Sequence, residues 1–579
     1  MVNLTINKEK VSVKEGTTIL EAAKEIGIKI PTLCYLKNVN QTGSCRVCLV
    51  EVEGAQRLVT SCNTVVSEDM VINTRSEKVR KARRINVELL LSNHEVTCTS
   101  CVRSGNCELQ TLSNTLGIID NIYEKKIVKK PWDINFPLIR DNAKCISCLR
   151  CVQVCNNIQN VGVWDTVNSG GKTSVGVYGN KDINDSHCVL CGQCIVHCPV
   201  GALRVRDDTE IFRDMLHDES KVTIVQIAPA IRTAWGEDLG ISSEVATVEK
   251  LITSLRRMGA DYIFDTTFSA DLTIMEEGME FIHLLKEGDE SKFPLYTSCC
   301  PAWVSFIKSN FPNSVKHLST AKSPQQMFGT VIKEEVAKNM CIDRENINVV
   351  SIMPCLAKKA ERELPTMKTN GDPDVDLVIT TRELARMVKA SFIDPAVLEE
   401  GQFDRIQGAN VGDGTGAGVI FGATGGVMEA SLRSVYAILT NEKPDPSKFY
   451  NVRPVDGNVG WREAKIDIGD KTLNIAIASG LANARKIVDA VEKGEKHYHF
   501  VEIMACPGGC VGGGGQPISH DFEISLFRGS TLYTLDKKAD LRFSHENPSI
   551  ISLYERRPDL VHELHTDHTK WDIPPNPFV

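Results

Sequence analysis

Two stretches with the same cysteine spacing decide the fold of the front of the chain: CISCLRCVQVC at residues 145–155 and CVLCGQCIVHCP at residues 188–199. Both follow C-x2-C-x2-C-x3-C, the bacterial pattern in which three close cysteines bind one 4Fe–4S cubane and the fourth reaches a second cubane. Zinc does not explain the duplication, because a zinc site takes only four ligands. The pattern predicts a two-cluster ferredoxin domain with crossed ligand sets. These sets are Cys145, Cys148, Cys151 and Cys198 for one cluster, and Cys188, Cys191, Cys194 and Cys155 for the other.

Residues 1–78 contain another group of cysteines. Short β-type runs alternate there with one helical stretch, TILEAAKEIG at residues 18–27, which predicts a small β-grasp sheet with a packed helix. Two thiolates for each iron suit a 2Fe–2S cluster, although the spacing departs from the plant-type run. A four-cysteine zinc site is the alternative, and the neighbouring cluster motifs favour iron–sulfur. The candidate ligands are Cys34, Cys45, Cys48 and Cys62.

Residues 79–125 have a helical pattern and hold a third group, made of one histidine and three cysteines. Three cysteines are too few for an ordinary cubane, and a neutral imidazole that replaces a thiolate raises a cluster's potential. A zinc site is again the alternative. The candidate ligands are His94, Cys98, Cys101 and Cys107. Two prolines in KKPWDINFP, residues 129–137, predict a linker after this segment.

The bulk composition limits the classes of function. The chain has 579 residues, which favours three to four domains. Its net charge of −8 is spread without a long basic block, so neither nucleic acid nor an anionic membrane is an expected partner. The N-terminus lacks a secretory pattern, and no long apolar window predicts a membrane span, so we expect a cytoplasmic protein. In such a chain, 21 cysteines indicate metal or redox chemistry rather than disulfides.

From residue 210 onward, β-type runs alternate with helical segments, which predicts an α/β domain that its size and glycine-rich middle divide into two lobes. Six cysteines lie in this part, too far apart for a ferredoxin loop. They are Cys299, Cys300, Cys341, Cys355, Cys506 and Cys510. Cys341 stands apart from any motif, and we interpret it as a small buried hydrophobe or an inert thiol.

The other five cysteines lie in three distinctive motifs: TSCCPAW at 297–303, MPCLAKK at 353–359 and ACPGGCVGGGGQP at 505–517. In this order, and with AKSPQQMFG, IMEEG and IFGATGGVMEA also present, they resemble the signature motifs of FeFe-hydrogenases. The resemblance covers essentially the whole chain and is closest to clostridial-type members with four accessory clusters. It implies a multidomain α/β protein. The expected domains are a 2Fe–2S ferredoxin-like domain at 1–78, a His/Cys3 4Fe–4S domain at 79–125, a two-4Fe–4S ferredoxin domain at 126–209 and a catalytic domain at 210–579.

The resemblance implies that the back half binds an H-cluster. In the family this is a 4Fe–4S cubane joined by one thiolate to a two-iron subsite with carbon monoxide, cyanide and an azadithiolate bridge. By resemblance, Cys300, Cys355 and Cys506 hold the cubane, and Cys510 both holds it and bridges to the two-iron subsite. Glycines around Cys510 let the backbone approach a bulky cofactor closely. Lys358 is expected to pair with a cyanide, although an ordinary surface lysine is the alternative. The expected pocket residues are Pro229, Ala230, Ser323, Gln325, Met353 and Phe421.

Protons must reach the same cofactor through carriers within hydrogen-bond distance of one another. By resemblance, the Cys299 thiol passes protons to the azadithiolate amine, and Glu277, Glu280 and Ser319 continue the relay. The two glutamates are three residues apart, which places them on one helix face. An exposed pair is the alternative, because glutamates on helices are mostly exposed. In the relay, Glu280 is expected to be buried with a raised pKa.

The resemblance therefore implies interconversion of H2 with two protons and two electrons. It implies an H-cluster, three accessory 4Fe–4S clusters and one 2Fe–2S cluster, with maturation proteins that supply the diiron subsite. No strand–GxGxxG–helix unit is evident, so the electron partner is either ferredoxin or an NAD(P)-linked partner subunit. The alternatives are an electron-transfer subunit of a respiratory-type NADH dehydrogenase, a hydrogen sensor and a cluster-assembly protein. The three motifs of the back half favour the hydrogenase over all of these.

Overall fold

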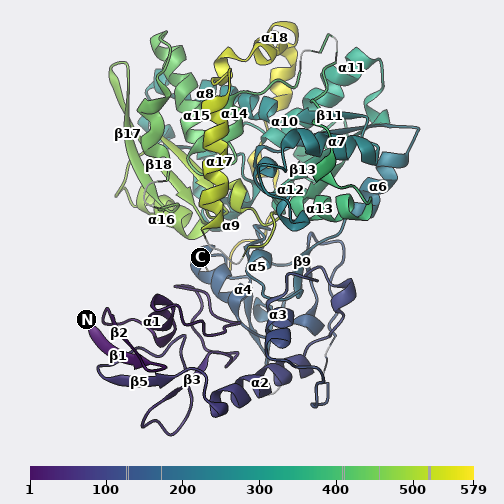
Figure 1. Cartoon of the computed structure of the whole chain (residues 1–579). Helices are drawn as coiled ribbons and strands as arrows, with labels where there is room; N and C mark the ends of the chain where they lie inside the picture. The colour runs from purple at the N-terminus through teal and green to yellow at the C-terminus, as the bar shows by residue number, and fades with distance from the viewer. Residues whose placement is uncertain are drawn as a thin grey trace. The chain divides into compact units, whose positions relative to one another are not determined.

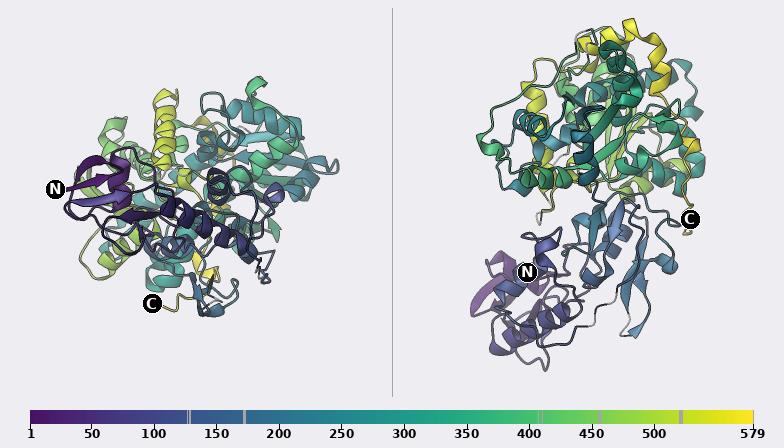
Figure 2. Two further views of the ribbon diagram at one scale, coloured as in Figure 1. Left: turned by 60° about the horizontal axis from the view of Figure 1, so that its bottom comes forward. Right: turned by 90° about the vertical axis from the view of Figure 1, so that its right-hand side faces the viewer.

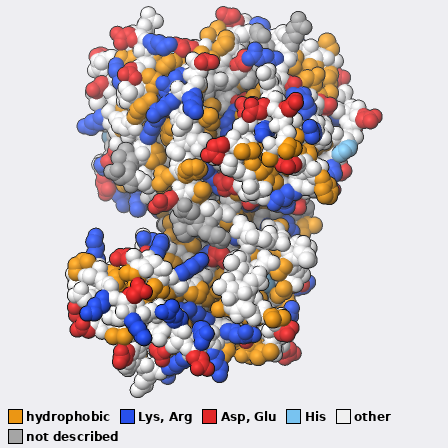
Figure 3. Space-filling view, in the orientation of Figure 1, with side chains coloured by type: hydrophobic (Ala, Val, Ile, Leu, Met, Phe, Trp, Pro, Cys, Tyr) orange, Lys and Arg blue, Asp and Glu red, His pale blue; other side chains and the backbone are white. Residues whose placement is uncertain are grey.

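The computed structural model describes residues 1–578 except 126, 128, 171–172, 407, 410, 455–456 and 520–522 (Figure 1). The chain divides into two compact units. The first unit comprises residues 1–158, 162–186 and 197–206, and the second comprises 159–161, 187–196 and 207–579. Within the described residues, no helix is both long enough and apolar enough to cross a bilayer. On the face in Figure 3, basic and acidic side chains are interspersed over both units.

The first unit begins with a five-stranded sheet in the order β2-β1-β5-β3-β4. Its strands are β1 (Val2–Ile6), β2 (Glu9–Val13), β3 (Leu49–Val52), β4 (Val59–Thr60) and β5 (Met70–Asn73). β1 is antiparallel to β2 and parallel to β5. Helix α1 (Ile19–Glu25) buries Ile19, Ala22 and Ala23 in the same core as Ile6 and Ile72. The predicted β-grasp sheet with one packed helix is confirmed.

The rest of the first unit is built from helices and two short two-stranded sheets. The helical prediction for the segment after the sheet is confirmed by α2 (Glu77–Ser92) and α3 (Glu108–Thr115). In the ferredoxin region, β6 (Leu138–Arg140) pairs with β9 (Leu203–Val205), and β7 (Trp164–Val167) pairs with β8 (Ser174–Val177). Each pair is antiparallel. The first cysteine loop leads into α4 (Arg150–Gln153).

The second unit contains two four-stranded sheets, each with its own hydrophobic core (Figures 1 and 2). One sheet has the order β11-β10-β13-β16 and is parallel throughout. The other has the order β12-β19-β18-β17, in which only β17 is antiparallel to its neighbour. The strands are β10 (Val222–Ile227), β11 (Tyr262–Asp265), β12 (Leu295–Tyr296), β13 (Ile347–Met353), β16 (Leu377–Thr380), β17 (Arg462–Ile468), β18 (Lys471–Ser479) and β19 (Phe500–Met504). The predicted two-lobed α/β architecture is confirmed.

Helices join the two lobes. The 21-residue helix α8 (Thr267–Glu287) places Phe268 in the core of the first sheet and Phe281 in the core of the second. Its middle packs in a smaller core with Cys299 and Phe421. The other principal helices are α7 (Val248–Met258), α9 (Pro301–Asn310), α10 (Pro324–Val331), α12 (Ala357–Glu361), α13 (Thr381–Ala390), α15 (Gly426–Thr440), α16 (Leu481–Glu492), α17 (Ile524–Lys538) and α18 (Pro548–Arg556).

The interpretation of Cys341 as a buried hydrophobe is wrong. Its side chain is exposed, and its backbone has φ of 55° as the residue that ends α11 (Ala337–Met340). The left-handed conformation stops the helix and turns the chain outward. An isolated cysteine in a sequence carries no information on such a turn.

Helices α15 and α17 are tied by a fully buried ion network. Arg433 donates to both oxygens of Asp536, at 2.9 and 2.8 Å, and to Glu429. We expect Arg433→Met to destabilise the second unit by about 1.5–3 kcal/mol, because it removes charge-assisted hydrogen bonds from two buried carboxylates, although Arg453 and Arg542 still bind them. Thermal unfolding of the purified chain tests this. Arg405→Met, in the exposed Arg405–Asp413 pair, is the control and should cost at most about 1 kcal/mol. Equal effects of the two substitutions would contradict the prediction.

Candidate functional site

Four cysteines of the second unit follow the carboxyl ends of its strands, the edge at which open α/β sheets bind ligands. Cys300 comes after β12 and caps α9, Cys355 comes after β13, and Cys506 comes after β19. Cys510 begins a short 3-10 turn four residues later. Burial, followed by the charges of neighbouring thiols, raises the pKa of Cys355 to about 11 and that of Cys506 well above its usual value. The four thiols therefore lie close together; Cys506 is buried and the other three are half-buried.

The backbone beside Cys510 packs so closely against the backbone of residues 422–424 that it leaves no space for a side chain. Gly509 has φ of 94°, and a Cβ placed on it would lie 2.6 Å from the Thr424 nitrogen. A larger residue is therefore excluded both by conformation and by space. Four converging thiols with this glycine-lined backbone fit an iron–sulfur cofactor better than a disulfide.

Lys358 is buried next to these thiols, so the alternative of an ordinary surface lysine is wrong. Its Nζ donates to the Cys299 carbonyl at 3.2 Å and to both oxygens of Glu361, at 3.1 and 3.0 Å. Burial opposes its charge, but the carboxylate of Glu361 and the thiol of Cys355 keep the pKa of Lys358 above its ordinary value. A cation is thus held inside the site.

Glu361 binds Lys358 and two of the expected pocket residues. Besides Lys358, it accepts hydrogen bonds from Ser323 Oγ at 3.0 Å and from Gln325 Nε2 at 3.2 Å. The other amide atom of Gln325, Oε1, is buried without a hydrogen-bond partner in the described part of the chain. Glu361 was not among the expected residues. Its spacing of three from Lys358, which places two residues on one face of a helix, was the signal that could have found it.

The remaining expected pocket residues are also buried. Phe421 packs in the small core that contains Cys299, with Cys300 and Cys510 against it. Pro229 and Ala230 follow β10, and Gln516 Nε2 donates to the Ala230 carbonyl at 3.0 Å. Met353 ends β13 in the core of the first sheet.

The carboxylates of α8 lie next to Cys299. Glu277 is fully buried, and its Oε1 accepts a hydrogen bond from the Ser298 backbone at 3.0 Å. Its Oε2 has no hydrogen-bond partner among the described residues. Burial, and next the charge of Glu280, raises the pKa of Glu277 to about 8. Burial, and next Glu277, also raises the pKa of Cys299 well above its usual value.

Glu280 continues this line of groups. It accepts a hydrogen bond from Ser319 Oγ at 2.7 Å and is only half-buried, so the expectation of full burial is wrong. The expected direction of its pKa is confirmed. Burial raises it, although hydrogen bonds from Ser319 and Thr320 act in the opposite sense. The glutamates share one face of α8, as their spacing predicts.

Beyond Glu280, the line of hydrogen-bonded groups continues with residues that are distant from it in the sequence. Thr320 Oγ1 lies 2.8 Å from His565 Nδ1, and His565 Nε2 lies 3.1 Å from Glu276. Tyr554 donates to the same carboxylate at 2.5 Å. His565 is 245 residues from Thr320, and nothing in the local sequence signals this contact.

The first unit brings together the other predicted ligand groups. The thiols of Cys34 and Cys45 interact with each other, as do those of Cys48 and Cys62, and all four are buried. Asn40 Nδ2 donates at 2.9 Å to the carbonyl oxygens of both Cys34 and Cys148.

His94 is buried, and burial lowers its pKa, so its imidazole is neutral. Its Nδ1 lies 3.0 Å from the Lys144 carbonyl, which can only accept, so Nδ1 carries the proton and Nε2 keeps its lone pair. Metal-bound histidines are commonly oriented in this way. The charge of Cys101 contributes to the raised pKa of Cys107, after burial, which places these two thiols near each other.

One predicted ferredoxin ligand set lies within the first unit, whereas the other is divided between the two units. One cavity of the first unit is lined by all four members of the predicted crossed set, Cys145, Cys148, Cys151 and Cys198. Of the other set, Cys155 belongs to the first unit, whereas Cys188, Cys191 and Cys194 belong to the second. In the second unit, Gln193 Nε2 donates to the Gly512 carbonyl at 2.9 Å, and Cys506 Sγ lies 3.7 Å from the Cys191 carbonyl.

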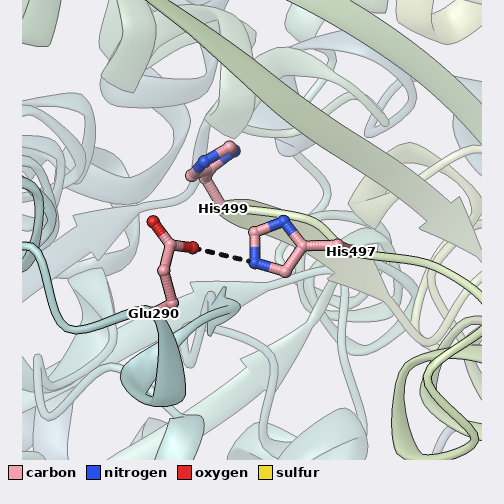
Figure 4. A group of neighbouring side chains, drawn as sticks. All are labelled: Glu290, His497 and His499. Atoms are coloured by element: carbon pink, nitrogen blue, oxygen red, sulfur yellow. Dashed lines mark ion pairs between the residues drawn. The ribbon is translucent and has the colours of Figure 1, made fainter.

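A separate group of metal-ligating side chains lies near the start of β19 (Figure 4). Glu290, His497 and His499 have ligand atoms within 4.8 Å of one another, and His497 Nε2 lies 3.1 Å from Glu290. The His499 Nδ1 accepts the Asn474 backbone N–H at 2.9 Å, so its Nε2 carries the proton. A metal could bind His499 Nε2 only if the proton moved to Nδ1, and this would break the hydrogen bond from the Asn474 backbone.

Comparisons with protein families agree with this layout. A model described as "Iron only hydrogenase large subunit, C-terminal domain" matches residues 221–514. Models for a 2Fe-2S cluster binding domain, an NADH-ubiquinone oxidoreductase-G iron-sulfur binding region and a 4Fe-4S dicluster domain match 1–77, 83–121 and 144–202. An iron hydrogenase small subunit model matches 523–571, a segment not distinguished in the predicted catalytic domain.

Individual relatives extend over nearly the whole chain. The NADP-reducing hydrogenase subunit HndD of Solidesulfovibrio fructosivorans is 48% identical, and iron hydrogenase 1 of Clostridium pasteurianum is 38% identical; in both cases 96% of each chain is covered. The solved structure of apo FeFe-hydrogenase HydA1 from Chlamydomonas reinhardtii matches with a TM-score of 0.56 and 37% identity. It covers 63% of this chain and 99% of that chain.

The raised pKa of Glu277 has a measurable consequence. Its folded pKa of about 8 lies above its ordinary value, so the folded protein retains a proton that the unfolded chain loses. This contribution to stability is complete below about pH 4 and is lost as the pH rises through about 8. Between about pH 4 and about pH 8 the natural chain loses this contribution, whereas glutamine does not titrate. We therefore expect the free energy of unfolding of Glu277→Gln to increase, relative to that of the natural chain, as the pH rises.

Infrared spectroscopy provides the direct measurement. A protonated-carboxyl band that is present at pH 6, weakens above pH 8 and is absent from Glu277→Gln is the expected result. If Glu277 is already ionised at pH 6, the inferred protonation is wrong.

Proposed function

The chain belongs to the iron-only hydrogenase family, and we propose how its residues carry out the interconversion of H2 with two protons and two electrons. Members of this family bind an H-cluster, and this chain also carries 2Fe–2S and 4Fe–4S domains. The observation that supports the proposal best is the set of four neighbouring thiols at the strand ends, with a buried cation and a buried acid beside them. These are the groups that a site for electrons and protons requires.

In this proposal Cys300, Cys355, Cys506 and Cys510 would hold the H-cluster. When bound, the H-cluster supplies the iron and the basic bridge at which H2 is made or cleaved. The chain contributes charge and shape. Lys358 presents a cation to the anionic ligands of the cofactor, and Glu361 fixes the position of that cation.

Ser323 and Gln325, held by the same Glu361, supply the polar wall of the pocket. Gln325 Oε1 is free of protein partners in the described residues, and its amide group can therefore turn toward a ligand. Phe421, packed beside the cysteines, keeps water away from the reacting centre. Exclusion of water strengthens the electrostatic interactions inside the site.

Protons pass along a line of side chains to the site. Glu280, at the half-buried end, exchanges protons through Ser319 with Glu277, which is protonated near neutral pH because burial raises its pKa to about 8. Glu277 then supplies the Cys299 thiol, the last carrier before the cofactor. Thr320 and His565 extend the line outward. Carriers whose pKa values lie near the working pH transfer protons most effectively.

Electrons travel through the predicted accessory groups, one 2Fe–2S cluster and three 4Fe–4S clusters. The group with Cys34 meets the set with Cys148 through Asn40. The loop with Cys191 contacts Cys506 and the Gly512 backbone within the second unit. Each of these contacts supports one step of electron transfer within its own unit.

We further propose that the chain is the catalytic subunit of a cytoplasmic, NAD(P)-linked complex, with its diiron subsite supplied by maturation proteins. HndD, similar over 96% of both chains, is an NADP-reducing hydrogenase subunit, and residues 83–121 match an NADH-ubiquinone oxidoreductase region. Ferredoxin is the alternative partner.

The partner proposal predicts that the purified chain evolves H2 from reduced viologen but does not use NADPH until partner subunits are added. Hydrogen production is the measurement for both donors. NADPH-dependent H2 production by the chain alone would contradict the proposal. Full-rate electron supply by reduced ferredoxin alone would favour the alternative partner.

The proton route predicts the effect of one substitution on α8. We expect Glu280→Gln to lower H2 evolution by about 100-fold or more, because a neutral amide cannot carry a proton. Glu287→Gln is the matched control. Glu287 is on the same helix and pairs with Lys292 at the surface, so its loss should leave the rate nearly unchanged. Cluster content must be equal in both variants, and a fully active Glu280→Gln enzyme would exclude the route.

A further inference from the structure

Arg103 is a buried arginine in the turn between Cys101 and Cys107 of the first unit. Its Nε donates to the Asn106 carbonyl at 2.6 Å, and its Nη1 donates to the Cys198 carbonyl at 2.9 Å. Its Nη2 is buried without a hydrogen-bond partner in the described residues. A buried N–H group without a partner is costly, so the position of this guanidinium needs an explanation.

The guanidinium lies between two predicted ligand groups. Its charge acts to lower the pKa of Cys198, of the ferredoxin set, and that of Cys107, of the His94 set, in both cases against the larger effect of burial. Gly201 lies close to both Cys101 and Arg103. A Cβ on it would lie 2.6 Å from Cys101 Sγ and 3.8 Å from Arg103 Cγ.

The charge of Arg103 has no carboxylate partner among the described residues. Arg150, buried at the same ferredoxin set, differs in this respect, because both of its Nη atoms bind the Glu108 carboxylate, at 2.5 and 2.8 Å. A buried cation needs an anion nearby. An iron–sulfur cluster with thiolate ligands is anionic, and its negative charge grows by one electron on reduction.

We propose that Arg103 is a positioning residue that raises the reduction potentials of the two clusters on either side of it. These are the clusters of the Cys145, Cys148, Cys151 and Cys198 set and of the His94, Cys98, Cys101 and Cys107 set. A fixed positive charge stabilises the reduced cluster more than the oxidised one, and charge, hydrogen bonds and exposure set such potentials. Each cluster gains one electron from the partner, no bond forms or breaks, and the guanidinium stays protonated.

This inference rests on the proposed cluster ligands and adds a role for their surroundings. The ferredoxin set also receives the Asn40 contact that leads to Cys34. Because the clusters of the Cys198 set and of the His94 set have raised potentials, electrons that enter the first unit collect on these two clusters. Two electrons can then be held close to the path while the H-cluster waits for its second proton.

The test is an EPR-monitored redox titration of the full chain with its accessory clusters assembled. The diiron subsite is not needed, so the readout is independent of hydrogenase activity. In Arg103→Gln we expect both clusters to become harder to reduce, with at least a tenfold lower ratio of reduced to oxidised cluster at a fixed potential. That ratio corresponds to about 59 mV for a one-electron couple. The 2Fe–2S signal, remote from the substitution, should not move.

Two further variants keep the test decisive. Arg103→Lys retains the charge and should shift the potentials less than Arg103→Gln. Glu108→Gln removes the anion that offsets Arg150 and that adjoins Cys107 in the chain, so it should shift both clusters in the opposite direction. If Arg103→Gln fails to assemble its clusters, Arg103→Lys still decides: midpoints close to those of the natural chain are expected, and a tenfold or larger change in the ratio of reduced to oxidised cluster would overturn the role of the charge.

The outcomes separate the inference from the proposed function. Assembled clusters with unchanged midpoints in Arg103→Gln, or a Glu108→Gln shift of the same sign as that of Arg103→Gln, would overturn the role of Arg103 and leave the hydrogenase proposal intact. Failure of the natural chain to assemble these clusters, despite full iron supply, would overturn the proposed ligand sets themselves.

Discussion

The structure of the second unit depends on one constraint: four thiols from distant parts of the chain must share a single space that is closed to water. Strand ends meet this constraint, because β12, β13 and β19 deliver Cys300, Cys355 and Cys506 to neighbouring positions. The two sheets need separate cores to do so, and α8 joins those cores. Loss of solvent, and next the charges of the neighbouring thiols, raises the pKa values of Cys355 and Cys510, so as bare thiols they are protonated and poorly suited to bind metal. Bound iron provides the positive charge that reverses this effect.

Burial also determines how protons and electrons are handled. On the proton side, a carboxyl group without a counter-ion keeps its proton, as Glu277 does. Lys358, in contrast, keeps its charge because Glu361 lies within 3.1 Å. In the first unit the buried cations are arginines, of which Arg150 has an acid partner and Arg103 has none. The same low-polarity surroundings thus produce a neutral acid, a fixed cation and an unbalanced cation, according to which partner the fold supplies.

The sequence predicts best the features that depend on short spacing. The crossed ferredoxin set was predicted from a repeated eleven-residue pattern, and its four cysteines line one cavity. The β-grasp sheet and the shared face of Glu277 and Glu280 follow from local periodicity in the same way. Contacts between segments that are distant in the sequence could not be predicted from local patterns. The pairing of His565 with Thr320, or of Arg103 with Cys198, depends on tertiary packing. The exposure of Cys341 depends on a turn that its neighbours in sequence do not reveal.

The central claim is that Cys300, Cys355, Cys506 and Cys510 hold an H-cluster. The most direct measurement is the infrared spectrum of the anaerobically purified chain after the diiron cofactor is supplied, in the region of metal-bound carbon monoxide and cyanide. We expect bands in this region, and we expect Cys510→Ala to lose them while the EPR signals of the accessory clusters persist. The absence of such bands from the natural chain, with iron content sufficient for every cubane, would contradict the claim and leave an electron-transfer protein.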